Sequence, residues 1–113
     1  MLAKTNRLGR KKDIERVFDK GSGFKEDFLI LKTVKNNLNK TRFAFIVSSK
    51  VSPKATVRNK IKRKLRELVR IKLKKIKLGT DNILIASPGL ESKDFWETEE
   101  TVAQLFKKAK IIP

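Results

Sequence analysis

The chain has 113 residues, no cysteine and no histidine, and 29 lysines and arginines against 12 aspartates and glutamates, which gives a net charge of +17. This length fits one small domain over residues 1–113. The composition excludes disulfides, zinc ribbons, thiol nucleophiles and histidine-dependent catalysis. Because so large a charge excess destabilises the folded state through self-repulsion, it favours a protein that binds a polyanion.

Hydrophobic periodicity predicts helices and strands in alternation. The expected elements are a basic arm over 1–10, a helix over 11–20, an extended segment over 24–34, a strand over 42–48, a helix over about 54–77, a strand over 82–86 and a helix over about 93–110. Gly21 fits the end of the first helix, and Ser22 and Gly23 form a turn. Both faces of the run from Phe28 to Val34 are apolar, which predicts a strand that is covered or nearly covered on both sides. We therefore expect an α/β (α+β) sandwich of one mixed sheet and three helices.

The long helix carries the strongest functional pattern. At 100° per residue, one arc is apolar, and the opposite arc holds Asn59, Arg63, Arg66, Arg70, Lys74 and Lys77. Thirteen basic residues and one acid, Glu67, lie between Lys50 and Lys77, so few acid–base pairs are available to neutralise this face. We interpret it as a surface for a phosphate backbone. A membrane surface or an acidic partner helix is the weaker alternative, because the apolar stripe is needed against the sheet.

Other residue types indicate little further chemistry. Most of the seven phenylalanines are expected in the core, and Phe18 and Phe24 are the less certain ones. Trp96 is assigned no role. The acidic residues show no spacing typical of a metal site or an acid–base pair, and no histidine is present to activate a serine. The sequence therefore predicts no catalytic residue and no metal ligand in the protein.

The string from Val57 to Glu67, Val-Arg-Asn-Lys-Ile-Lys-Arg-Lys-Leu-Arg-Glu, resembles the signature of the bacterial ribonuclease P protein subunit. In that family an Arg-Asn-Arg core precedes Ile-Lys-Arg-Arg-Leu-Arg-Glu or close variants. Asn6-Arg7-Leu8 and the Val17-Phe18 stretch before Gly21 support the resemblance, which spans nearly the whole chain. It implies the order α-β-β-β-α-β-α and the fold of the second domain of a small-subunit ribosomal protein. It also implies a left-handed crossover through the basic helix, against the usual handedness.

The resemblance further implies a non-catalytic subunit of an endoribonuclease that removes 5′ leaders from precursor tRNA. The RNA subunit would perform the cleavage with Mg²⁺, and the protein would hold no cofactor of its own. Its partners would be the ribonuclease P RNA and the 5′ leader, with no DNA. By position, the residues expected to bind RNA, with Arg70 added from the basic arc, are Arg7, Lys50, Arg58, Asn59, Lys60, Lys62, Arg63, Arg66 and Arg70.

The same resemblance implies a leader-binding cleft between the first helix and the sheet, lined by Ile14, Phe18 and Leu31. Lys60 replaces the second arginine of the core, which keeps the charge and loses the bidentate fork. Ile14 and Leu31 stand where an aromatic residue and a tyrosine are common. These replacements favour apolar and electrostatic holding of the leader over base stacking.

Two alternatives stay open. A structural RNA-binding protein of ribosomal type, with no processing role, would share the fold. A DNA-binding regulator would need a recognition helix placed after a short turn from another helix, whereas a strand precedes the basic helix here. No apolar run approaches the ~20 residues of a membrane helix, and no secretory signal is evident. We therefore expect a cytoplasmic protein without a membrane partner.

Overall fold

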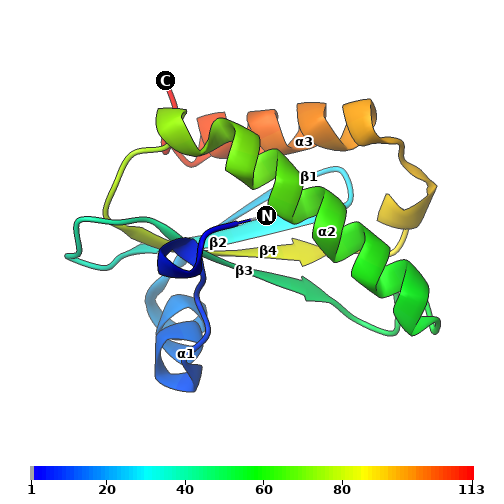
Figure 1. The fold of residues 1–113 in the computed structure, drawn as a ribbon, viewed down its shortest axis with the longest axis horizontal. Coiled ribbons are helices and arrows are strands. Elements are labelled where there is room, and N and C mark those ends of the chain that lie inside the picture. Colours follow the sequence, from blue (N-terminus) through cyan, green and yellow to red (C-terminus); the bar gives the residue numbers. More distant parts are fainter. Residues whose placement is uncertain (1) are drawn as a thin grey trace.

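Helices cover both faces of one four-stranded sheet in the computed structural model, which describes residues 2–113 (Figure 1). The elements are α1 (Lys11–Lys20), β1 (Ser22–Glu26), β2 (Leu29–Lys35), β3 (Arg42–Val47), α2 (Ala55–Lys72), β4 (Thr80–Ala86) and α3 (Phe95–Lys108). Short 3₁₀ turns lie at Lys4–Asn6, Leu73–Lys75 and Leu90–Ser92. The predicted order α-β-β-β-α-β-α is confirmed.

The sheet is mixed, and its strands follow the spatial order β1-β2-β4-β3. β2 is antiparallel to both β1 and β4, whereas β3 and β4 are parallel neighbours. The chain passes from β3 to β4 through α2, which lies with α3 above one face of the sheet (Figure 1). This crossover is left-handed, as the resemblance implied, and it departs from the usual handedness of such connections.

A hairpin stands where one extended segment over 24–34 was expected. β1 pairs with β2 from Ser22↔Thr33 to Glu26↔Leu29. Asp27, at the turn between the strands, has a φ of 49°. Aspartate tolerates this left-handed conformation better than most residues, so the turn needs neither glycine nor proline. The expected turn at Ser22 and Gly23 was wrong, since both residues belong to β1.

The main core lies between the sheet and the helices α2 and α3. Phe43 and Val47 of β3 point to this face, as their alternation predicted, and Ala44 and Ile46 point to the other. The apolar stripe of α2 also packs here, with Ile61, Leu65, Leu68 and Val69 buried. The phase of the amphipathic helix is therefore confirmed.

The opposite face of the sheet is covered only in part. A small cluster of Leu8, Val17 and Ile83 joins α1 and the N-terminal arm to this face. Burial of one valine contributes only about 1.5–3 kcal/mol, so α1 gains modest stability from apolar contact. Ile30 and Ile85 are half-buried, so the cover of the sheet is complete on one face and partial on the other.

The long helix is shorter than the predicted range to about residue 77. α2 ends at Lys72, a 3₁₀ turn follows, and buried Ile76 adopts an extended conformation. Gly79, with a φ of 98°, then turns the chain into β4. Over residues 2–113, none of the helices combines the length and the apolar character that crossing a membrane requires.

Candidate RNA-binding site

The outward face of α2 is a cationic surface, and along most of its length no carboxylate of residues 2–113 pairs with its cations. Asn59, Lys60 and Arg63 are exposed, while Lys62 and Arg66 are half-buried along the flank of the helix. Within residues 2–113, none of these four cations forms an ion pair with a carboxylate. Because like charges at this spacing repel one another, the surface gains stability when phosphates bind to it.

The beginning of α2 adds a positive helix end to these charges. No side chain caps the helix at Lys54, and its first turn holds no acid. Arg58 donates a hydrogen bond from Nη1 to the carbonyl oxygen of Ser52 at 2.9 Å, so it braces the loop before the helix. Lys50 is exposed in the same loop. Free backbone N–H groups and the helix dipole make this end suited to an anion such as phosphate.

The N-terminal arm is attached to the free edge of β3. Leu8 donates its backbone N–H to the carbonyl oxygen of Phe43 at 2.8 Å, and Arg7 forms an isolated parallel bridge with the same residue. Arg7 also donates from Nε to the carbonyl oxygen of Leu2 at 3.0 Å. These contacts hold Arg7 beside the sheet although the arm has little regular structure.

One hollow of about 340 Å³ brings residues from four parts of the chain together at the edge of β3. Its cations come from the arm and from α2, and its apolar residues come from the arm, α1 and β3. The lining residues are Leu2, Arg7, Leu8, Ile14, Phe43, Ala44, Phe45, Ile46, Lys62 and Arg66. Thus Arg7, Lys62 and Arg66, expected to bind RNA, lie beside Ile14, expected in the leader cleft.

The sheet face beside α1 is only partly covered and carries half-buried isoleucines. Ile30, Ile85 and Ile46 are neighbours in one row across β2, β4 and β3. Phe18, on α1, is 42% exposed. Such a face offers apolar contact to bases, and Lys25 continues the row on β1 with a cation.

The expected place of Leu31 in the leader cleft is wrong. Leu31 is fully buried and belongs to the core beneath α2 and α3, on the other face of the sheet. Successive residues of a strand point to opposite faces, so its neighbours Ile30 and Lys32 lie on the face beside α1 instead. The apolar alternation of the strand marked both faces, but it did not show which face the long helices cover.

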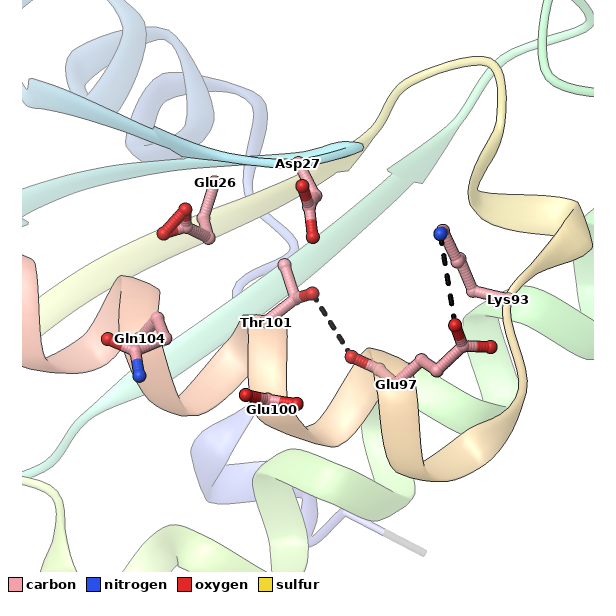
Figure 2. A pocket seen from close by; sticks show the side chains of 7 residues that line it. All are labelled: Glu26, Asp27, Lys93, Glu97, Glu100, Thr101 and Gln104. Carbon is pink, nitrogen blue, oxygen red and sulfur yellow. Dashed lines mark hydrogen bonds and ion pairs between the residues drawn. The ribbon is translucent and has the colours of Figure 1, made fainter.

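An acidic hollow lies at the other edge of the sheet, between α3 and the β1–β2 turn. Glu26 and Asp27 come from the turn, and Glu97 and Glu100 come from α3 (Figure 2). The described residues contain no group of three or more histidine, cysteine, aspartate or glutamate side chains that could hold a metal ion. Because these carboxylates repel phosphates, they favour an RNA approach from the β3 edge, where cations predominate.

Comparison with known proteins agrees with this geometry. The family model described as Ribonuclease P matches residues 2–110. The ribonuclease P protein component of Alkaliphilus metalliredigens is 33% identical and covers 98% of this chain and 99% of its own length. The corresponding protein of Clostridium botulinum is 36% identical, over 96% of this chain and 97% of its own.

Solved structures show the same fold. The RNase P protein of Staphylococcus aureus matches with a TM-score of 0.89 at 27% identity, over 97% of this chain and 100% of that one. The RNase P protein from Thermotoga maritima, in complex with 1-(4-fluorophenyl)-2-thiourea, matches with a TM-score of 0.83 at 31% identity. The match covers 90% of this chain and 98% of that one. A family model that spans nearly the whole chain and relatives of equal length lead to one conclusion: the chain belongs to the ribonuclease P protein family.

Proposed function

We propose that this subunit of ribonuclease P binds the RNA subunit through α2 and the N-terminal arm, and holds the 5′ leader of precursor tRNA in the cleft beside α1. The hollow at the edge of β3 carries this proposal. There, Arg7, Lys62 and Arg66 lie beside Ile14, so the cationic surface and the apolar cleft are continuous. One RNA assembly can therefore meet both surfaces at once.

The role of α2 is electrostatic. Lys60, Lys62, Arg63 and Arg66 are free to neutralise phosphates that crowd together in a folded RNA. Each phosphate contact that displaces a counterion contributes affinity that falls as salt rises. Lys62 and Arg66 also face the apolar hollow, where a contacted phosphate is less exposed to water.

The role of the cleft is to add contacts that mature tRNA lacks. The isoleucine row of the sheet and the partly exposed Phe18 offer apolar surface to the bases of a single strand. Lys25 and Lys32 stand on the same face and suit its phosphates. Binding of precursor is thereby strengthened relative to product.

The protein supplies binding and orientation, and the RNA subunit performs the cleavage with Mg²⁺ that it holds itself. The side chains at the β3 edge are cations and apolar groups, which are unsuited to ligating Mg²⁺. No nucleophile or general base of the protein enters the reaction.

Reconstitution tests the proposal. The purified protein is mixed with a bacterial ribonuclease P RNA at low Mg²⁺, and cleavage of a precursor tRNA and the Kd values of precursor and mature tRNA are measured. We expect stimulated cleavage and tighter binding of the precursor. Lys62→Gln and Arg66→Gln should reduce stimulation, whereas Lys107→Gln, an exposed cation near the end of α3, should not. RNA binding without stimulation would contradict the proposal and favour a structural RNA-binding protein.

A further inference from the structure

Helix α1 needs more than apolar packing to stay against the sheet. Val17 is the buried residue among its ten, and Phe18 is largely exposed. The helix begins after Arg10, whose side chain makes no capping hydrogen bond. An isolated helix of this length is marginal in water, so polar contacts must contribute to its docking.

A buried carboxylate lies at the sheet end nearest α1. Asp81, at the start of β4, is fully buried. Arg42 of β3 donates to both of its oxygens, from Nε to Oδ1 at 2.8 Å and from Nη2 to Oδ2 at 2.7 Å. Asn36 donates from Nδ2 to Oδ1 at 2.8 Å. This charge-assisted, bidentate geometry makes the carboxylate a rigid point of the sheet.

Two residues of α1, one helical turn apart, extend this arrangement. Arg16 places Nη1 3.7 Å from Oδ2 of Asp81, and its Nη2 donates to the carbonyl oxygen of Lys35. Asp13 places Oδ2 3.4 Å from Nη1 of Arg42. Asp81 and Arg42 of the sheet therefore each lie close to a residue of opposite charge on α1. We call Asp13, Arg16, Arg42 and Asp81 the anchor cluster.

The anchor cluster constrains both the position and the rotation of α1. Two contacts on one side of a helix oppose its rolling, because a roll would separate at least one of the pairs. Ile14 follows Asp13 directly, and Phe18 stands one turn beyond Ile14. A change in the roll of α1 would therefore move the helical wall of the cleft relative to the isoleucine row of the sheet.

We propose that Arg16 and Asp13 are positioning residues, which set the width of the leader cleft by fastening α1 to the Arg42–Asp81 pair. This inference rests on the proposed function of the cleft. Arg16 acts through α1 and the sheet, since its guanidinium is directed to Asp81 and to the backbone of Lys35.

Arg16→Gln is the main test, made in the complex with ribonuclease P RNA. Arg42 still satisfies Asp81 in this variant, so no buried charge loses its main partner. The measured quantity is the ratio of the Kd of mature tRNA to that of precursor. We expect it to fall roughly three- to fivefold, the size expected for one partly exposed ion pair. Affinity for the RNA subunit should stay within about twofold, because α2 is untouched.

Three further variants separate positioning from charge. Lys12→Gln removes the same charge from an exposed position of α1 and should leave the ratio unchanged. Asp13→Asn makes the protein more positive, yet it should lower the ratio, whereas a purely electrostatic effect would raise it. Arg16→Lys should recover part of the loss. Amide hydrogen exchange should become faster in α1 of Arg16→Gln and stay unchanged in α2.

Several outcomes would overturn the proposal. The positioning role fails, and the proposed function stands, if the wild-type complex prefers precursor and Arg16→Gln keeps that preference. The same conclusion follows if Asp13→Asn strengthens the preference for precursor. Unchanged exchange of the α1 amides in Arg16→Gln would also contradict the positioning role. A wild-type complex with no preference for precursor would overturn the proposed function and this inference together.

Discussion

Arg70 donates hydrogen bonds to both carboxylate oxygens of Glu67 on α2, from Nη2 to Oε1 at 2.5 Å and from Nε to Oε2 at 3.0 Å. The hydrogen bond from Arg70 lowers the pKa of Glu67, and the same contact raises the pKa of Arg70. The outward arc of α2 is therefore uneven. Among residues 2–113, the cations near the beginning of the helix form no ion pair with a carboxylate, whereas Arg70 already has a carboxylate partner.

The first prediction concerns this pair. Arg70→Ala should weaken binding to ribonuclease P RNA less than Arg63→Ala, because a phosphate must compete with Glu67 for the Arg70 guanidinium. We expect a loss of roughly tenfold for Arg63→Ala and less than about threefold for Arg70→Ala, since one charged hydrogen bond is involved. Titration of folded RNA at fixed salt measures both. Equal losses would show that RNA displaces Glu67 without cost.

Glu67→Gln should strengthen RNA binding at neutral pH, because it releases Arg70 from its charged partner. Protonation of Glu67 would release Arg70 in the same way, but only at low pH. The pKa of Glu67 is lowered, so its pairing with Arg70 is complete above the ordinary glutamate value and is lost as the pH falls through the lowered value. The enhancement in Glu67→Gln should therefore be constant between about pH 6 and 8. Enhancement confined to one side of that window would contradict this account.

Salt dependence tests the phosphate contacts themselves. If α2 contacts about four to six phosphates, the logarithm of the binding constant should fall steeply with the logarithm of salt, by about 0.7–0.9 per phosphate. Arg63→Ala should reduce the slope by about one such unit and leave the melting temperature nearly unchanged, because Arg63 is exposed. Arg66→Ala should reduce the slope by a similar amount but lower the melting temperature more, because Arg66 is half-buried and its side chain also packs against apolar residues. A flat salt response of the wild type would refute electrostatic binding by α2.

Leu31→Ala and Ile30→Ala form a matched pair on one strand. Leu31 is fully buried in the main core, so its truncation should lower the free energy of unfolding by about 2–5 kcal/mol. Ile30 is half-buried on the cleft face, so its truncation should cost less stability and reduce the preference for precursor over mature tRNA. Denaturant unfolding and the two tRNA affinities distinguish these effects. A specific loss of leader binding in folded Leu31→Ala would restore Leu31 to the cleft.

The last prediction concerns α3 and is independent of RNA. Asp94 accepts a hydrogen bond from the backbone N–H of Glu97 at 2.8 Å, and Glu97 accepts one from the backbone N–H of Asp94 at 3.1 Å. Asp94→Ala removes this capping box and should lower the free energy of unfolding by about 1 kcal/mol. RNA affinity should stay unchanged, because α3 lies outside the proposed interface. A thermal or denaturant transition identical to the wild type would show that the cap is dispensable.

The hydrophobic periodicity within a segment was sufficient to predict features that belong to a single helix or strand. The helix over residues 11–20 and the buried stripe of α2, including Ile61 and Leu65, followed from spacing alone. The hairpin was not located, because its turn at Asp27 depends on a left-handed residue that composition does not mark. The end of α2 at Lys72 was missed as well, because Ile76 fits the apolar spacing of a continued helix although it lies beyond the 3₁₀ turn.

The sequence by itself determined the amphipathic phase of α2, the position of its cations and the family, because these depend on residues close together in the chain. Only the tertiary structure decided which face of β2 the long helices cover, so that Leu31 lies in the main core and Ile30 on the face beside α1. It also decided that Arg16 reaches Asp81 and that Arg7 lies beside Lys62. Strand pairing and helix docking set such contacts between distant residues, and hydrophobic spacing within a segment carries no information about them.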